Sequence, residues 1–152
     1  MIFLKSLQSI AFSIPAFVLI ITGILKLIDF NSFVTDNQTF FLSLFQLELF
    51  NSKTFISLLS ALLVITELVL GTSLLLARQK RFISMLTAKL FLFFILINVI
   101  KLILDDSSSC GCFGSMLEAD VYTMINIDII ILLIIVITLY TLRQNIGGEY
   151  VK

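Results

Sequence analysis

The sequence predicts an all-α membrane protein, a single domain that crosses the bilayer with four helices. Hydrophobic residues make up 59% of its 152 residues and charged residues 13%, whereas a soluble domain is about half apolar and about a quarter charged. The apolar residues form four runs, each long enough to cross roughly 30 Å of hydrocarbon at about 1.5 Å per residue. Polar connectors separate the runs. These observations predict a four-transmembrane-helix bundle.

The first two spans are expected at residues 7–28 and 55–77. The first contains Pro15, which a membrane helix tolerates where its neighbours satisfy the freed carbonyl group, so we expect a kink and not a break. Lys5 precedes this run and no small-residue cleavage site follows it, which favours an uncleaved anchor over a removed signal peptide. The second run has Glu67 as its only charged residue.

The third and fourth spans are expected at residues 82–104 and 121–142. Each carries polar side chains within its apolar sequence, and these are Lys89, Asn98 and Lys101 in the third and Asn126 and Asp128 in the fourth. Polar groups inside a span are costly and usually face the interior of the bundle.

The connector between the first two spans, residues 29–54, has an apolar middle, Phe40–Phe50. This segment is too short to cross the bilayer and too apolar for a free loop. We therefore expect a short interfacial or re-entrant helix that lies on the bundle. The alternative is that the segment is the beginning of the second span.

Charge in the connectors predicts the orientation, because Lys and Arg are enriched in short cytoplasmic loops. The connector after the second span holds three basic residues and no acid, whereas residues 105–120 hold four acids. Both termini are thus expected in the cytoplasm, with connectors 29–54 and 105–120 outside it, in a bacterial inner membrane. The sequence has no basic tract and no His, which argues against nucleic-acid binding and excludes His-based catalysis.

Both cysteines, Cys110 and Cys112, lie in the connector 105–120 on the expected extracytoplasmic side, the oxidising one in a bacterium. A bridge between them would close a very small, strained ring, and Gly111 would remove a side-chain obstacle within it. Strained, exposed disulfides are typically labile and catalytic, and such a short loop adds little stability. The alternatives are a Cu(I) site of two thiolates and a local structural bridge or pair of reduced thiols.

Several polar side chains should lie in the outer half of the membrane beneath this cysteine pair; they are Lys26, Asn98, Lys101, Asn126 and Asp128. Asp128 is expected about 10 Å below the outer end of its span, within reach of Lys26 and Lys101. Both lysines could instead extend outward to the headgroups. Lys89, near the cytoplasmic end, is expected to do so.

Glu67 is expected near mid-membrane, about 20 Å from the outer end of its helix. That depth argues against a direct pair with Lys26 unless that helix begins late. Gly71, one turn further along, would let a neighbouring helix approach closely. The functional interpretation of Glu67 is a proton-handling group or a quinone contact, and the structural interpretation is a hydrogen bond between helices.

Four sequence pieces together resemble the MauE/DoxX-like family of redox-associated membrane proteins. They are Gly23-Ile-Leu-Lys26, Glu67-Leu-Val-Leu-Gly71, Cys110-Gly111-Cys112-Phe113-Gly114 and Asn126-Ile-Asp128. The resemblance implies a four-helix membrane bundle. It also implies that Cys110 and Cys112 are a redox pair, with Lys26, Glu67 and Asp128 at the family's intramembrane polar positions.

The two branches of the family imply different partners. The MauE branch is associated with making methylamine dehydrogenase, whose small subunit is rich in disulfides. The DoxX branch includes a subunit of a thiosulfate:quinone oxidoreductase. The residues do not say which branch's substrate applies.

The predicted function is that of a membrane thiol–disulfide oxidoreductase component. Its Cys-Gly-Cys pair would exchange disulfides with a periplasmic thioredoxin-like or cysteine-containing client protein. Its electrons would pass to a quinone or to another thiol protein, and no metal is expected. The main alternative is a non-catalytic membrane subunit or maturation factor with structural cysteines, and a further one is a small transporter or metal-handling protein.

Overall fold

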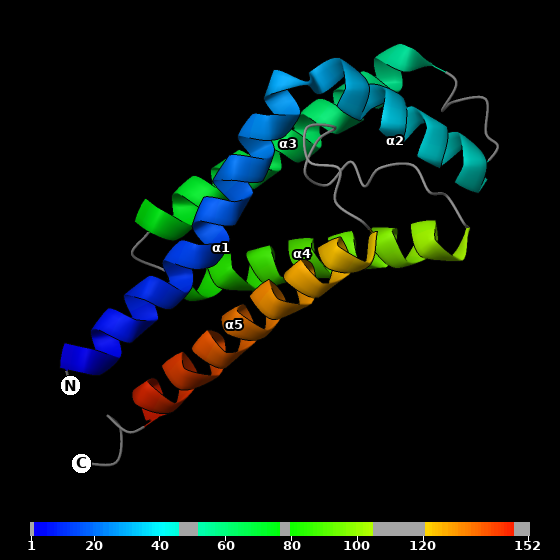
Figure 1. Cartoon of the computed structure of the whole chain (residues 1–152). Helices are drawn as coiled ribbons and strands as arrows, with labels where there is room; N and C mark the ends of the chain where they lie inside the picture. The colour runs from blue at the N-terminus through cyan, green and yellow to red at the C-terminus, as the bar shows by residue number, and fades with distance from the viewer. Residues whose placement is uncertain (1, 46–51, 77–79, 105–120, 148–152) are drawn as a thin grey trace.

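The computed structural model is a helical bundle, and it describes residues 2–45, 52–76, 80–104 and 121–147 (Figure 1). Its helices, in chain order, are α1 (Ile2–Ile28), α2 (Phe30–Phe45), α3 (Lys53–Leu76), α4 (Lys80–Ile103) and α5 (Val121–Gly147). All but α2 contain a stretch long and apolar enough to cross a membrane. The prediction of four membrane-spanning helices is therefore confirmed, and this is a multi-pass membrane protein in contact with the lipid bilayer.

The apolar stretches lie close to the predicted spans, at residues 11–28, 53–76, 81–103 and 121–141. Pro15 is buried within the unbroken helix α1, as its tolerated position in the apolar run predicted. Large apolar side chains point outward from all four of these helices, where lipid would surround them; examples are Phe17, Leu58, Phe82 and Ile137, which are 56%, 71%, 65% and 61% exposed.

Helix α2 begins earlier than the sequence predicted, at Phe30 and not at Phe40. Residues 31–39 were predicted only as part of the connector, but Phe33, Val34 and Phe40 are buried on one face of the helix. Their spacing is that of an amphipathic helix. Phe40 to Phe45 thus belong to α2 and not to the beginning of α3, while residues 46–51 lie outside the described part. The interfacial or re-entrant position of this helix stays a prediction.

The junction of α1 and α2 keeps helical hydrogen bonding across Asp29. The amide of Asp29 donates to the carbonyl of Leu25 over 3.2 Å, and the amide of Phe33 donates to the carbonyl of Asp29 over 3.1 Å. The chain changes direction at this point without exposing a row of unpaired backbone groups (Figure 1). As a result α2 lies at the end of the bundle opposite the first residues of α1 and the last of α5.

The bundle consists of two closely packed helix pairs, α1 with α3 and α4 with α5, and the pairs are joined by contacts of α1 with α5 and of α3 with α4 (Figure 1). The larger apolar cluster joins three helices and contains Leu19, Phe91, Phe94, Ile131 and Ile135. The contact between α3 and α4 is much less extensive than the contact within either helix pair. This uneven packing is what leaves room for a cavity between them.

Two glycines set the close approach of α1 and α3. A Cβ atom added at Gly71 would lie 2.9 Å from Cγ1 of Ile20 and 3.0 Å from the backbone oxygen of Ala16. One added at Gly23 would lie 2.9 Å from Cδ2 of Leu68. Small residues commonly allow membrane helices to pack this tightly. The prediction that Gly71 admits a neighbouring helix is borne out by these distances.

Candidate functional site

The predicted redox residues lie where the structure gives no description. Cys110, Gly111, Cys112, Phe113 and Gly114 all belong to residues 105–120, which connect α4 to α5. Their assignment as a redox pair therefore stays a prediction. Described residues of all five helices supply the rest of the candidate site.

The central feature of the site is a buried ion pair between Lys26 of α1 and Glu67 of α3. The ammonium Nζ of Lys26 donates a hydrogen bond to Oε1 of Glu67, and the two side chains are 1% and 0% exposed. The sequence argument against this pair was wrong, because it aligned the ends of the two helices at one membrane level. The other carboxylate oxygen of Glu67, Oε2, is buried and has no hydrogen-bond partner within the described residues.

The relative register of α1 and α3 explains how the pair forms. Gly23 lies against Glu67 and Leu68, so α1 ends well below the first residues of α3. Helix α2 packs against that protruding part of α3, where the Nδ2 atom of Asn37 donates to Oγ of Ser60 over 2.9 Å. Helical side chains lean toward the N-terminus, so the Lys26 side chain leans back toward the level of Glu67.

Aromatic rings complete the surroundings of the Lys26 ammonium group. Its Nζ atom lies 5.3 Å from the centre of the Phe33 ring and 5.1 Å from that of Phe94. Both distances are within the range of favourable cation–π contact. Together with Glu67 of α3, these contacts bring four helices, α1, α2, α3 and α4, together around one buried cation.

Lys101 of α4 is a second buried cation, only 3% exposed. Its Nζ atom lies 5.2 Å from the centre of the Phe40 ring. Among the described residues, no carboxylate lies within ion-pair distance of it. The alternative in which Lys26 and Lys101 extend to the headgroups is thus wrong for both, because their ammonium groups turn inward to aromatic rings. Lys89, by contrast, is exposed, in keeping with its predicted extension outward.

Asp128 of α5 is held by Asn98 of α4 and not by a lysine. Nδ2 of Asn98 donates to Oδ2 of Asp128 over 3.3 Å, and both side chains are buried. Asp128 also lies within electrostatic range of Lys26 and Glu67. The predicted ion pair of Asp128 with Lys26 or Lys101 is therefore replaced by a hydrogen bond, while the predicted gathering of these groups is found.

Asn126 does not join this cluster. Its side chain is exposed on α5, whereas Asp128 is buried two residues later. Positions two apart lie about 200° apart around a helix of 3.6 residues per turn, so the two side chains face opposite sides. The spacing in the sequence was therefore enough to predict that Asn126 and Asp128 face opposite sides of the helix.

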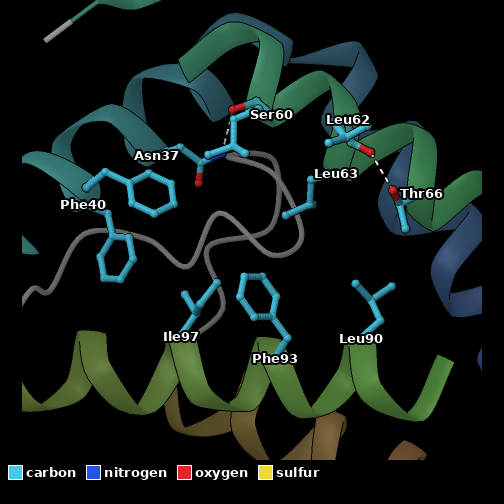
Figure 2. Close-up of a pocket in the computed structure, with 11 residues that line it drawn as sticks. Asn37, Phe40, Ser60, Leu62, Leu63, Thr66, Leu90, Phe93 and Ile97 are labelled. Atoms are coloured by element: carbon cyan, nitrogen blue, oxygen red, sulfur yellow. Dashed lines mark hydrogen bonds between the residues drawn. The ribbon is translucent and has the colours of Figure 1, made fainter. Parts of the chain in front are cut away.

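Two adjoining cavities lie beside the cluster. The smaller, about 30 Å³, is lined by Lys26, Phe33, Asn37, Leu63, Phe94, Ile97 and Lys101. The larger, about 240 Å³, lies between α2, α3 and α4 and is mostly apolar. Figure 2 shows Phe40 of α2, Leu63 of α3 and Phe93 and Ile97 of α4 around it. Asn37, Leu63 and Ile97 line both cavities.

Sequence reasoning missed the residues that α2 supplies, chiefly Phe33, Asn37 and Phe40. Their spacing of three to four residues was the available signal, and it indicates one face of a helix. Ser60 and Phe94 carried no signal of their own, because serines and phenylalanines are common throughout the apolar runs.

The arrangement can bind oxygen atoms and hold protons in a dry part of the bundle. Two ammonium groups can donate hydrogen bonds, and two carboxyl groups can accept them. The described residues contain no group of three or more His, Cys, Asp or Glu side chains placed to hold a metal ion.

Taken together, these features define a four-helix membrane protein with a charged cluster buried near one end of its bundle. The sequence matches the model of the MauE family, described as methylamine utilisation protein MauE, over residues 4–142. The match covers most of the chain, so the protein belongs to the MauE family, and the predicted membership is confirmed for this branch. The likeness to DoxX stays a resemblance. Neither a curated protein nor a solved structure matches the chain.

Proposed function

We propose that this protein is a membrane thiol–disulfide redox protein that acts through Cys110 and Cys112 on the extracytoplasmic face. The observation that carries the proposal is the Cys110-Gly111-Cys112 sequence in the α4–α5 connector, within the part of the chain that matches the MauE family. A membrane protein of a redox-related or maturation-related family that keeps both of its cysteines in one short connector is suited to disulfide exchange.

In the proposed reaction, a thiolate of a client protein attacks one sulfur of the Cys110–Cys112 disulfide. That S–S bond breaks and a mixed disulfide forms. The second thiolate of the client then attacks the mixed disulfide, so that the client leaves with its own disulfide and both cysteines here become thiols. Two electrons and two protons pass from the client to the pair, and a second thiol protein or a quinone takes them up to restore the disulfide.

The client is defined here by its chemistry, as a thioredoxin-like or cysteine-containing protein outside the cytoplasm. The family description refers to methylamine utilisation, which makes a protein of that pathway one candidate client. The charge of the connectors supports the orientation. The predicted connector after the second span carries Arg78, Lys80 and Arg81, which favours the cytoplasmic side, whereas residues 105–120 carry no Lys or Arg, which favours the outer side of a bacterial inner membrane.

The alternative function is that of a non-catalytic membrane subunit or maturation factor with structural cysteines. The observation that favours it is the number of buried polar contacts between helices, such as Lys26–Glu67 and Asn98–Asp128, because these would hold an inert scaffold together equally well. The difference between the two functions lies in the reactivity of the cysteines.

Single Cys110→Ser and Cys112→Ser variants separate the two functions. In a redox protein, the remaining cysteine should trap a client as a mixed disulfide that appears on a non-reducing gel and disappears with reductant. The double variant is the control and should trap nothing. If neither single variant traps a partner, and the double variant supports normal disulfide formation in extracytoplasmic proteins, the redox function is wrong.

A further inference from the structure

The larger cavity and the smaller one beside it together provide an amphipathic site. The lining residues that they share are Asn37, Leu63 and Ile97. Phe40, Phe41 and Phe93 supply aromatic walls, and the exposed side chains of Leu62 and Phe93 mark the side that opens toward lipid. At the other end the smaller cavity meets the side chains of Lys26 and Lys101. A molecule that enters from the membrane would therefore meet rings first and ammonium groups last.

The two lysines give this site its chemical preference. Lys26 is paired with Glu67, whereas Lys101 is 3% exposed and has only the Phe40 ring as a partner in the described part of the chain. Both buried ammonium groups can donate hydrogen bonds, so an occupant that offers an oxygen atom would be favoured there. The apolar lining favours a body of carbon atoms and a flat ring that can stack on phenylalanine.

We propose that this site, formed by α2, α3 and α4, binds the head of a lipid-soluble quinone, with a ring oxygen directed to Lys26 and Lys101. Typical ligand sites begin near ~300 Å³. The volume of about 240 Å³ lies below that size, so it suits one substituted ring more than an entire lipid. The tail would leave through the open side toward lipid.

This inference rests on the proposed function, because it supplies the electron acceptor for the cysteine pair. A quinone held there would take up the two electrons and two protons that Cys110 and Cys112 release when their S–S bond forms again. The chain's own contribution is to orient the ring between phenylalanines, to offer ammonium donors to its oxygen and to keep water out.

Equilibrium binding tests the site without requiring turnover. Tritiated decylubiquinone is titrated into the full-length protein in phosphatidylcholine nanodiscs, with empty nanodiscs to measure partition into lipid. We expect saturable binding, one molecule per chain. Lys101→Gln should weaken it about tenfold or more, as the loss of a charge-assisted hydrogen bond does. Lys89→Gln, which removes an exposed lysine of the same helix, should leave it unchanged.

A second pair of variants tests the apolar part of the site. Ile97→Trp fills the space shared by both cavities and should abolish saturable binding, whereas Leu96→Trp changes a lipid-facing neighbour that is 56% exposed and should not. Circular dichroism confirms that each variant is folded. Equal binding by Ile97→Trp and Leu96→Trp would place the quinone elsewhere and overturn the proposal, whatever the outcome for Lys101.

Two further outcomes separate this proposal from its rivals. If decylubiquinone does not bind saturably but phosphatidylglycerol or oleate does, and Ile97→Trp prevents it, the site belongs to an anionic lipid and the quinone proposal is wrong. The Cys110→Ser/Cys112→Ser protein should bind decylubiquinone normally. Normal quinone binding would leave the quinone site standing even if the redox function were rejected, that is, if neither single variant trapped a partner and the double variant supported normal disulfide formation. Trapped mixed disulfides without saturable quinone binding would reject only the quinone site.

Discussion

The Lys26–Glu67 pair provides the sharpest prediction about what holds the bundle together. Lys26→Met removes the ammonium group and leaves the Glu67 carboxyl without its partner, and Glu67→Leu does the converse. Both side chains are almost fully buried, at 1% and 0% exposure, so solvent screening does not reduce the effect. Removal of one partner of a buried pair costs about 3–5 kcal/mol. Each single variant should therefore lose that much unfolding free energy.

The double variant Lys26→Met/Glu67→Leu should behave differently. It removes both charges and fills their space with apolar groups, an exchange that is often neutral or stabilising in buried sites. We expect most of the lost stability to return, with a coupling energy of at least about 2 kcal/mol between the two positions. The measurement is reversible unfolding of the purified protein in mixed micelles with increasing dodecyl sulfate, followed by circular dichroism.

If each single variant costs less than about 1 kcal/mol, or if the double variant loses the sum of the two single losses, the pair is not coupled in the folded protein. Lys89→Met is the matched control, because it removes an exposed lysine from α4 and should change the stability by no more than about 0.5 kcal/mol.

Two other predictions compare matched positions in the same unfolding assay. Gly71→Ala should destabilise the protein by about 1–3 kcal/mol, because its Cβ atom would meet backbone as well as side chains of α1. Gly23→Ala should cost less, because its nearest contacts are with side-chain atoms of Leu68, which can shift more easily than backbone. Equal losses would contradict the packing described. Asn98→Leu should lower the unfolding free energy by about 1–3 kcal/mol, because it removes the hydrogen bond to Asp128. Asn126→Leu changes an exposed side chain and should have little effect. A larger loss of stability for Asn126→Leu than for Asn98→Leu would contradict the burial of Asn98 and the exposure of Asn126.

The four spans could be predicted from the sequence because each is a long run of mostly apolar residues. About twenty apolar residues in a row have few alternatives to crossing a membrane. The gathering of Lys26, Asn98, Lys101 and Asp128 was also predictable, since each position could be counted from a helix end. The shift of α1 relative to α3 along the bundle could not be predicted by counting residues, because it depends on the packing at Gly23 and Gly71.

Helix α2 shows a second limit of sequence reasoning. The sequence of residues 31–39 is mostly polar, and its helical signal is limited to the spacing of Phe33, Asn37 and Phe40. Because α2 was expected to begin later, its contribution to the cation site and to the larger cavity was not foreseen. Cavities arise from the imperfect fit of several helices, and a single sequence does not report that fit.

The most direct test of the central claim is the redox state of Cys110 and Cys112 in intact spheroplasts. A membrane-impermeant, mass-tagged maleimide is added before reduction, after a short treatment with dithiothreitol, and at intervals after the reductant is washed away. We predict no labelling at first, labelling of both cysteines after reduction, and loss of labelling within minutes as the disulfide forms again. Labelling before reduction, labelling only after lysis, or thiols that stay reduced after the wash would contradict a cycling disulfide on the extracytoplasmic face.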